Sequence, residues 1–587
     1  MQQHRWSFFI LLMITIVLYY PSLQNDFLAS WDDDAYIINN PDVHGLTTEN
    51  CKKIFSSYYV GNYQPLSMLS YAIEVSVAGL NPMVFHATNM LLHMGNSLLT
   101  YWFVWMLLYN VPAAFFAALV FAIHPMHVES VAWIAERKDL LYALFYLLSL
   151  IHYIKYIEGK KNIFYVYSVV FFLCSLLSKS MAVSLPVVLL IIDFYKKRPL
   201  SVSLLLSKFP FFLLFLLFGI IALRSQAEQA MVIAVKLPFV YHILQVCYSI
   251  SYYLVMFIFP FRFSALHYYP PSLVDGHPEW YFYVIPLFLL AVCFFPFIVK
   301  KYRSELLFGL LFFIVSIAPV LQIIPIGLAI VSERYTYMPY TGLLIPASLY
   351  ASSYFSSRVF SFEKIPVLLM SFLCIFYFVS SYKRIPQWKN SITLFTDVTE
   401  KYPHAAHAHW TLGNTHNTYK NYSLAIASFD KAIALDASYA MAFFNRGLAK
   451  YNKKDLRGAL ADYNTTLSLR PDYVPAYVNK GNVYLDLKQY EKALELYNTA
   501  LSSDSAHQLA LLYKSNALIQ LKRIDEAVDV LNTLIRINPH HGEAYYYRGV
   551  IYYNRQQREE ACADFKKSYH SGYDAVRDIV YAQCGGM

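Results

Sequence analysis

Three consecutive carboxylates follow the first apolar segment of this 587-residue chain. Asp32, Asp33 and Asp34 lie in the stretch LASWDDDAYIINNPDV, residues 28–43, just beyond an apolar run over about 8–20. A carboxylate at such a place could act as a general base for a reacting hydroxyl. The ordinary alternative is a solvated loop in which one aspartate caps a helix. The surroundings have to decide between these two interpretations.

A second group of ionisable residues lies at the ends of apolar segments. The group consists of Arg137, Lys138, Lys179 and Arg334. Charged side chains at membrane depth are costly unless they are solvated or paired, so such residues are functional candidates. The alternative for each is that its stem lies along the apolar region while its charge reaches the interface.

The composition indicates an integral membrane protein. The chain is 57% hydrophobic and only 14% charged, whereas soluble domains carry about 25% charged residues. The net charge of +9 fits lysine and arginine in cytoplasmic loops and does not point to nucleic acid. The seven cysteines are scattered, and no pair has metal-ligand spacing.

Twelve apolar segments are candidates for membrane helices, which need roughly 20 residues each. They cover residues 6–22, 86–108, 112–124, 139–155, 163–178, 181–195, 206–223, 238–259, 281–299, 304–322, 337–355 and 365–382. Basic residues favour the cytoplasmic side, so the clusters at 155–161, 195–198 and 300–303 orient the chain. Counting 238–259 as a crossing would place 300–303 outside. We therefore expect 238–259 to lie on the surface or to re-enter it.

Eleven crossings then remain, and they place both the acidic stretch and the C-terminal region outside. The acidic stretch opens the loop 23–85, which is far longer than the usual connection of about 4–6 residues. Loops of this length are often functional, which strengthens the catalytic interpretation of the carboxylates.

The C-terminal third repeats with a period of 34 residues. Small residues recur at Gly413, Gly447, Gly481, Ser515 and Gly549, and large residues at Phe429, Tyr463, Tyr497, Leu531 and Phe565. This spacing is the tetratricopeptide signature. The pattern predicts five repeats that start near 406, 440, 474, 508 and 542 within residues 406–587, with a capping helix at 574–584. Residues 388–405 would be a linker.

Repeat arrays of this kind usually bind peptides or assemble proteins. Four aromatic residues could face a concave groove or belong to the core of a helix pair: Tyr477, Tyr484, Tyr545 and Tyr546. Cys562 and Cys584 lie near the cap, and a disulfide between them would form in an oxidising compartment.

Several motifs together carry a resemblance that covers nearly the whole chain. They are WDDDAYIINNPDV, NYQPLSMLSY, FHATNMLLHMGNSLL, HPMHVESVAWIAERKDLL, SLLSKSMAV and SERYTYMPYTG, followed by the repeats. This order resembles the transmembrane and tetratricopeptide-repeat-containing family of O-mannosyltransferases and, more broadly, the GT-C class of glycosyltransferases. The resemblance implies a mainly α fold: a polytopic GT-C-like domain over 1–387, followed by an α-solenoid of repeats.

The resemblance assigns roles to individual residues. The catalytic acids fall on Asp32 and Asp33, and the pocket residues on His124, His127, Glu129, Asp139 and Glu333. The family often has an acidic residue after the lysine that matches Lys179, but this chain has Ser180. No metal ligand is assigned, because the histidines more plausibly shape the pocket, although a divalent cation stays open as a cofactor.

The resemblance also implies the chemistry. A polyprenyl-phosphate sugar, with mannose as the expected sugar, would donate to a hydroxyl of an acceptor on the outer face. The donor phosphate would be held by Arg137, Lys138, Lys179 and Arg334, since arginine suits bidentate contacts to phosphate. One carboxylate would take the hydroxyl proton. We favour Asp33 over Asp32 by a narrow margin, because neighbours in an extended segment point apart and only one can face the acceptor.

Two rival functions remain from the sequence. The protein could be a non-catalytic membrane scaffold whose repeats assemble partners, or an enzyme that modifies envelope glycans. If the protein is instead the expected O-mannosyltransferase, the repeats would recruit a protein acceptor. The expected location is a bacterial inner membrane with periplasmic repeats, with the endoplasmic reticulum membrane as the alternative.

Overall fold

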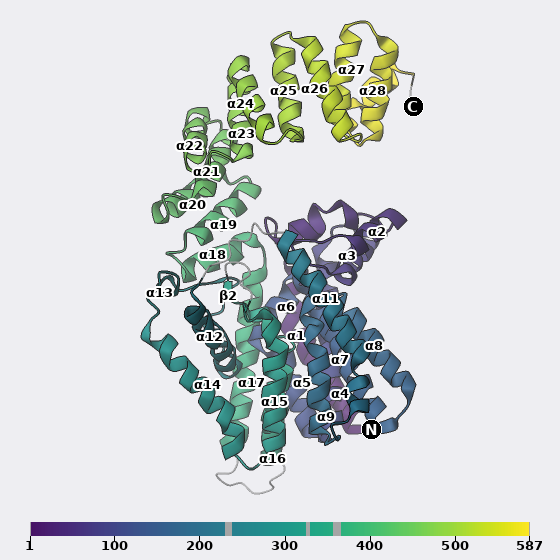
Figure 1. Cartoon of the computed structure of the whole chain (residues 1–587), viewed down its shortest axis with the longest axis vertical. Helices are drawn as coiled ribbons and strands as arrows, with labels where there is room; N and C mark the ends of the chain where they lie inside the picture. Colours follow the sequence, from purple (N-terminus) through teal and green to yellow (C-terminus); the bar gives the residue numbers. More distant parts are fainter. Residues whose placement is uncertain (1, 229–236, 324–328, 356–364, 586–587) are drawn as a thin grey trace. The chain divides into compact units, whose positions relative to one another are not determined.

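The chain is largely helical and divides into two compact units. The computed structural model describes residues 2–228, 237–323, 329–355 and 365–585 (Figure 1). The first unit is Met1–Tyr402 and the second is Pro403–Met587. Each unit has its own core and is described by itself.

All twelve predicted apolar segments form helices in the first unit. They are α1 (Gln2–Tyr19), α4 (Pro82–Leu108), α5 (Val111–Ile123), α7 (Arg137–Gly159), α8 (Asn162–Leu176), α9 (Leu185–Tyr195), α11 (Phe209–Glu228), α12 (Phe239–Ile258), α14 (Trp280–Ile298), α15 (Arg303–Ile317), α16 (Tyr340–Phe355) and α17 (Ile365–Arg384). Among the described residues, eight helices are long and apolar enough to cross a membrane, or nine if the bent pair Val111–Ile123 and Pro125–Ala132 is one span.

Short helices and turns connect the long ones. They are η1 (Tyr20–Gln24), η2 (Asp34–Ile38), η3 (Pro41–Val43), α2 (Thr48–Ser56), α3 (Pro65–Ala78), η4 (Pro125–His127), α6 (Val128–Ala132), η5 (Ile134–Glu136), η6 (Ser180–Ser184), α10 (Val202–Leu206), α13 (Pro271–Val274), η7 (Ala318–Val320), η8 (Glu333–Thr336), η10 (Ile385–Trp388) and α18 (Ser391–Lys401). The strands β1 (His267–Tyr268) and β2 (Ala329–Val331) pair antiparallel.

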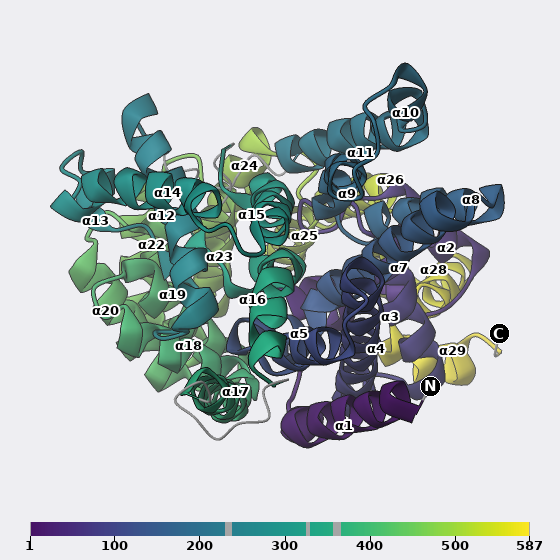
Figure 2. The same cartoon turned by 90° about the horizontal axis from the view of Figure 1, so that it is seen from below.

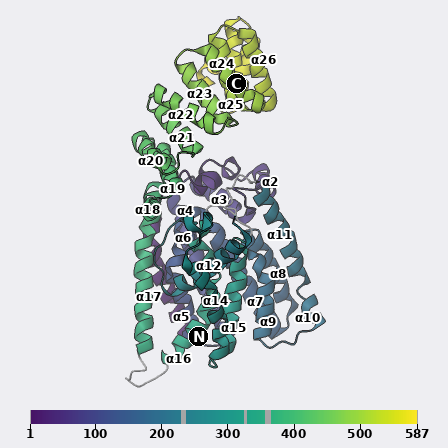
Figure 3. The same ribbon diagram turned by 60° about the vertical axis from the view of Figure 1, so that its left-hand side comes forward.

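The long helices form a bundle in which sequence neighbours often pack together. Helices α15 and α16 stand side by side in the view from below (Figure 2), and α8 lies beside α7 (Figure 3). Helix α11 packs against both α8 and α9. Their apolar side chains explain the packing, since helices that are apolar on most sides are either buried or face lipid.

The acidic stretch lies at the end of the bundle where the chain leaves the first unit. The Asp26 amide donates to the Lys389 carbonyl oxygen at 2.8 Å. The Trp31 ring stacks on Trp133 at 4.1 Å and on Trp388 at 6.4 Å between ring centroids. The loop after α1 and the turn after α17 therefore share one end of the unit, which we call the acidic face.

Both ends of α12 contact residues that follow other long helices. Near its start, the His242 Nε2 atom lies 3.0 Å from the carbonyl oxygen of Ile323, which follows α15. Near its end, the Phe257 carbonyl oxygen lies 3.1 Å from the Nε2 atom of His124, which follows α5. Helix α12 is long and apolar enough to cross a membrane, so the expectation that this segment does not cross stays a prediction.

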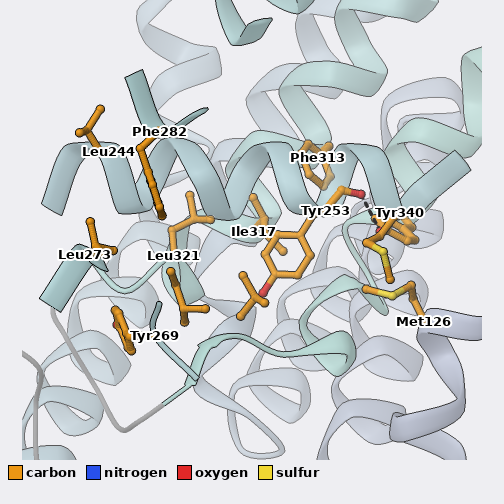
Figure 4. Close-up of a cluster of buried hydrophobic side chains, with 13 residues drawn as sticks. Met126, Leu244, Tyr253, Tyr269, Leu273, Phe282, Phe313, Ile317, Leu321 and Tyr340 are labelled. Carbon is orange, nitrogen blue, oxygen red and sulfur yellow. Dashed lines mark hydrogen bonds between the residues drawn. The ribbon is translucent and has the colours of Figure 1, made fainter. Parts of the chain in front are cut away.

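A buried apolar cluster holds α12 in this position (Figure 4). The cluster includes Met126, Leu244, Tyr253, Tyr269, Leu273, Phe282, Phe313, Ile317, Leu321 and Tyr340. The Tyr340 hydroxyl donates to the Tyr253 carbonyl oxygen at 2.7 Å, so α16 is tied to the middle of α12. Burial of so many large side chains makes α12 part of the core of the unit.

The second unit consists of five helix pairs and a cap. The pairs are α19 (Ala406–Thr418) with α20 (Tyr422–Leu435), α21 (Ala440–Asn452) with α22 (Leu456–Leu469), α23 (Val474–Asp486) with α24 (Tyr490–Ser503), α25 (Gln508–Gln520) with α26 (Ile524–Ile537), and α27 (Gly542–Asn554) with α28 (Arg558–His570). The cap is η11 (Asp574–Val576) and α29 (Arg577–Gln583). The first helix of each pair begins at the predicted repeat start.

The small and large positions of the repeat meet inside each helix pair. A methyl group added to Gly481 would lie 2.5 Å from the Tyr497 ring, and one added to Gly413 would lie 2.5 Å from the Phe429 ring. No Cβ atom fits there, so the glycine lets the two helices approach until the aromatic ring covers the backbone. The 34-residue period therefore reflects the packing of a small residue against a large one in each helix pair.

Three sequence predictions concern the linker, the repeat tyrosines and the cysteine pair. The expected linker 388–405 is ordered structure, because α18 lies within it and buries Leu394, Phe395 and Val398. Of the four tyrosines considered for a groove, Tyr545 is buried, and the other three are half-buried against the repeat cores: Tyr477, Tyr484 and Tyr546. Cys562 and Cys584 form a disulfide that ties α28 to the cap.

Candidate active site

The acidic stretch is a helical turn and not the extended segment that was expected. Asp32 and Asp33 begin a turn that continues as η2. The turn is preceded by Ser30, whose φ of 66° is left-handed, and the Ser30 amide donates to Asp34 Oδ2 at 2.6 Å. Successive residues of a helical turn point about 100° apart, so the carboxylates of Asp32 and Asp33 still face different surroundings.

Asp33 is enclosed by hydrogen-bond donors. Its Oδ2 atom accepts from the Leu28 amide at 2.8 Å. Its Oδ1 atom accepts from the Ala135 amide at 2.9 Å and the Trp133 indole at 3.1 Å. The residue is fully buried. Burial raises the pKa of Asp33 to about 7, against the lowering effect of these donors. Both oxygens are occupied, so Asp33 has no free face for an acceptor.

Asp32 is the more accessible carboxylate. Its side chain is 22% exposed, and its Oδ2 atom lies 3.8 Å from Lys138 Nζ. Partial burial raises the pKa of Asp32, and the Lys138 ammonium lowers it in part. A carboxylate with one free face and a raised pKa is suited to accept a proton. The geometry therefore reverses the narrow preference for Asp33.

Three cations converge on a residue that the sequence analysis did not single out. The Glu136 carboxylate lies 3.1 Å from Lys138 Nζ, 3.6 Å from Lys179 Nζ and 3.2 Å from Arg334 Nε. Glu136 is fully buried. Its place within the quoted motif, directly before Arg137, was the only signal in the sequence. Glu136 thus joins three of the four predicted phosphate-binding cations into one cluster.

Two more carboxylates of the cluster are predicted pocket residues. Lys179 Nζ lies 2.5 Å from Asp139, and the Arg334 guanidinium lies 2.5 Å from Glu129. The Arg334 amide also donates to Glu129 at 3.1 Å. The Lys179 side chain remains 12% exposed and that of Arg334 18%. Each cation is held by a buried carboxylate and keeps a part of its surface accessible.

Arg137 does not belong to this cluster, contrary to expectation. Its guanidinium lies 2.5 Å from Glu74 and donates to Asn89 Oδ1 and the Phe85 carbonyl oxygen, both at 2.9 Å. The side chain is fully buried. Every direction of the guanidinium fork is engaged, so Arg137 joins α7 to α3 and α4 and cannot contact a lipid phosphate.

The remaining predicted pocket residues support the backbone around the site. His124 Nδ1 accepts from the Met126 amide at 3.2 Å, and His127 Nδ1 lies 2.8 Å from the Phe121 carbonyl oxygen. Both histidines are buried. They shape the turn after α5, and neither side chain is free to touch a substrate.

Glu333 is also internal. Its carboxylate accepts from the Ser264 amide at 2.6 Å and lies 3.2 Å from the Arg384 guanidinium. Burial alone would raise the pKa of Glu333, but Arg384 and His267 more than offset it and hold the pKa below its usual value. Glu333 therefore pairs with Arg384, and its sequence neighbour Arg334 pairs elsewhere.

An apolar groove opens beside the cluster. Its volume is about 540 Å³, and its walls come from α11 and from η7, which follows α15. Phe215, Leu216, Ile220 and Leu223 line one side, and Ala318, Pro319 and Val320 the other. Lys179 and Tyr335 lie at its polar end. Lys179 Nζ is 5.7 Å from the centre of the Tyr335 ring, so the groove leads directly to the cation cluster.

Within the described ranges, no group of three or more His, Cys, Asp or Glu side chains is arranged to hold a metal ion. The carboxylates of the cluster each contact a cationic side chain instead. Among the three cations, Lys179 and Arg334 keep accessible faces, which are 12% and 18% exposed.

Comparisons with known proteins find tetratricopeptide repeats and protein O-mannosyl-transferases. Models of the tetratricopeptide repeat match residues 386–440, 420–474, 444–510, 484–548 and 543–568. The chain is similar to Protein O-mannosyl-transferase TMTC1 of Homo sapiens, with 36% identity over 142 residues, which are 22% of this chain and 16% of that protein. Protein O-mannosyl-transferase TMTC4 of Homo sapiens is 33% identical over 172 residues, 26% of this chain and 23% of that protein.

The alignments thus span less than a quarter of each of these relatives. Among solved structures, the chain is similar to the crystal structure of YrrB, a TPR protein with an unusual peptide-binding site. That match has 24% identity and a TM-score of 0.26, and it covers 31% of this chain and 93% of YrrB. The curated homologues are protein O-mannosyl-transferases, and the C-terminal unit is a tetratricopeptide array.

Proposed function

We propose that this protein is an integral-membrane O-mannosyltransferase that moves mannose from a polyprenyl-phosphate donor to a hydroxyl of a protein acceptor. One observation carries the proposal. Asp32, a partly exposed carboxylate, is linked through Lys138 and Glu136 to Lys179, which lies at the polar end of an apolar groove. A base, a set of cations and a lipid-sized groove thus lie together.

The donor would lie with its prenyl chain in the groove between α11 and η7. Its phosphate would meet the accessible faces of Lys179 and Arg334, which are 12% and 18% exposed. Arginine suits a phosphate because its planar fork can make two parallel hydrogen bonds. The apolar walls favour a long hydrocarbon chain, since each buried methylene contributes roughly 0.8 kcal/mol.

The chemical step then needs one bond change at the anomeric carbon. The acceptor oxygen forms a bond to that carbon while the bond from the carbon to the donor phosphate oxygen breaks. The electron pair leaves with the lipid phosphate, whose charge the cations stabilise. Asp32 takes the hydroxyl proton, a contribution of about 10²–10⁴-fold in rate for general bases.

Conversion of Asp32 to asparagine tests this role. Purified protein in nanodiscs would be incubated with radiolabelled polyprenyl-phosphate mannose and a lysate as the source of acceptor. We expect Asp32→Asn to reduce transfer by at least about a hundredfold while donor binding and folding persist. Asp34→Asn is the matched control, because Asp34 bonds only within its own turn, and it should retain most activity.

The Asp33→Asn variant tests whether Asp33 supports the local fold or acts in catalysis. An amide cannot accept with both of its polar atoms, so the donor from Leu28 would lose its partner. We expect a lower melting temperature together with the lost activity. If Asp32→Asn transfers mannose normally, the carboxylate is not the base. If the parent protein itself transfers no mannose, a membrane scaffold becomes the better assignment. The same assay with EDTA, and then with Mg²⁺ or Mn²⁺ restored, tests the divalent cation.

We further propose that the repeat array recruits the acceptor on the side where the acidic stretch lies. The chain leaves the first unit at the acidic face, as the contact between Asp26 and Lys389 requires. The disulfide in the array fits an oxidising compartment, such as a periplasm or a lumen. A bacterial inner membrane with periplasmic repeats remains our assignment.

A further inference from the structure

A second cavity lies at the end of the first unit that is opposite the acidic face. It has a volume of about 870 Å³ and opens between the end of α9 and the start of α15. The donor groove touches η6 before α9 and η7 after α15. Helix α15 has 15 residues and rises about 1.5 Å per residue, so the two cavities are separated by roughly 20 Å. We call this second cavity the basic groove.

The basic groove carries a strong excess of positive charge. Four cations line it, Lys197, Arg198, Lys300 and Arg303, and Glu305 is the one carboxylate among its lining residues. The Glu305 carboxylate already accepts from the Tyr195 and Ser304 hydroxyls at 3.2 and 2.9 Å.

Arg198 is fixed in place without being neutralised. Its guanidinium lies 2.7 Å from the buried Asp193 carboxylate, and Lys208 Nζ lies 2.7 Å from the same carboxylate. Two cations therefore share one negative charge. In the described parts of the chain, neither Lys197 nor Lys300 forms an ion pair, and both are exposed. The groove is thus an anion site with positive charge to spare.

Most of the remaining lining is apolar, and part of it is exposed. Phe194 is 69% exposed and Leu200 80%, and Leu307 and Leu311 continue the apolar wall along α15. Arg303 lies over the Phe297 ring at 5.0 Å, which holds its charge at the rim. A ligand that matches this surface has an anionic head and a hydrocarbon tail.

We propose that the basic groove binds an anionic phospholipid of the leaflet opposite the acidic face. Its phosphate would contact Lys197, Lys300 and Arg303, and the first part of an acyl chain would lie along Leu307 and Leu311. Basic pockets between membrane helices on the cytoplasmic side commonly bind such head groups. The assignment to the cytoplasmic leaflet rests on the proposed orientation, whereas the binding chemistry does not.

Native mass spectrometry of the full-length protein in detergent tests the proposal. Phosphatidylglycerol and phosphatidylcholine of the same acyl chains would be added in competition. We expect the protein to retain phosphatidylglycerol preferentially. The triple variant Lys197→Gln, Lys300→Gln, Arg303→Gln should lose this retention by about tenfold or more, as loss of hydrogen bonds to charged groups does.

Two further variants sharpen the result. Lys301→Gln is the matched control, because Lys301 is an exposed neighbour that does not line the groove, and it should bind like the parent. Leu307→Trp fills the groove without changing charge and should also reduce retention. Melting temperatures of all variants exclude unfolding as the cause.

Three outcomes would overturn the proposal. The first is equal retention of both lipids by the parent protein, and the second is normal retention by the triple variant. The third is displacement of phosphatidylglycerol by glycerol phosphate or by polyprenyl phosphate at equal concentration, which would assign the groove to a free phosphate or to the carrier lipid. None of these results bears on mannose transfer at the acidic face, so the two proposals fail independently.

Discussion

The three donors around Asp33 fix the backbone turn on which Asp32 is mounted. Asp33 accepts from the Leu28 and Ala135 amides and the Trp133 indole, so one carboxylate ties the loop after α1 to the segment before α7. Asp32 then keeps a free face beside Lys138. A catalytic group needs such support, because small displacements of a base from its substrate are costly in rate.

The pH dependence of transfer should report on Asp32. Partial burial raises its pKa, and Lys138 opposes that effect. The base must be ionised, so kcat/KM should fall as the pH drops through the pKa of Asp32 in the folded protein. Lys138→Met removes the opposing charge and should move this acidic limb to higher pH. Lys138→Arg keeps the charge, so the limb should stay close to its original position. An unshifted limb in Lys138→Met would assign it to another group.

Arg137 and Arg334 should respond differently to truncation. Arg137→Ala and Arg334→Ala each leave a buried carboxylate unpaired, which costs about 3–5 kcal/mol of stability. Of the two, only Arg334 belongs to the cluster that we propose to bind the donor. Arg334→Ala should therefore also weaken binding of polyprenyl-phosphate mannose by roughly tenfold or more.

Equilibrium binding to the folded fraction separates these effects. Arg137→Ala serves as the matched control, because it breaks an equivalent pair outside the site. A normal donor affinity in Arg334→Ala would make Arg334 a purely structural partner of Glu129 and Glu136.

At the scale of elements, helix α12 has the composition of a membrane span and is packed into the core of the first unit. Its two ends contact Ile323 and His124 through His242 and Phe257. Polar side chains along it, Gln245 and Ser249, bond to the segment after α15. Buried polar groups need such partners in an apolar environment. The helix thus covers one side of the candidate site.

The glycine positions of the repeats predict a strong local effect of a larger side chain. Gly481→Leu would drive a side chain into the Tyr497 ring, which lies 2.5 Å from the added Cβ position. Overpacking of this kind costs about 1–3 kcal/mol. We expect faster hydrogen exchange in α23 and α24 of the intact protein, measured by mass spectrometry.

Ser515→Ala is the control for this change. Ser515 holds the same repeat position opposite Leu531, is fully buried and already carries a Cβ atom. The exchange of α25 and α26 should change little. Unaltered exchange in Gly481→Leu would mean that the helix pair can open without cost, against the packing account of the repeat.

At the scale of the whole molecule, the charge distribution predicts on which side each region lies. The basic clusters at 155–161, 195–198 and 300–303 should be cytoplasmic, and the repeats should lie outside. Lys488 and Lys160 are both exposed residues with left-handed φ values of 59° and 52° at helix ends. They offer equivalent positions for a reporter cysteine in the two compartments.

In spheroplasts of an expressing bacterium, Lys488→Cys should react with a membrane-impermeant thiol reagent, and Lys160→Cys should react only after lysis. Cys51 and Cys293 would be replaced by serine to remove background. Cys562 and Cys584 should stay unreactive until reduction, because they form a disulfide. Labelling of Lys488→Cys only after lysis would contradict the orientation and the recruitment of an acceptor on the acidic face.

The sequence by itself determined the elements of this protein. All twelve apolar segments that the sequence predicted are helices in the first unit, and the 34-residue period predicted the starts of all five repeats, from Ala406 to Gly542. Both signals are local, since helix length and helix pairing depend on residues a few turns apart. The basic clusters also singled out 238–259 as a segment that need not cross.

Only the tertiary structure decided how the charged residues are paired. Arg137 binds Glu74, Lys179 binds Asp139, and Arg334 binds Glu129 instead of its neighbour Glu333. The exposure of Asp32 and the burial of Asp33 likewise follow from Trp133 and Ala135, about a hundred residues away. Neighbours in a helical turn point in different directions, so adjacent charges enter different environments, and the packing of distant helices selects which charge meets which partner.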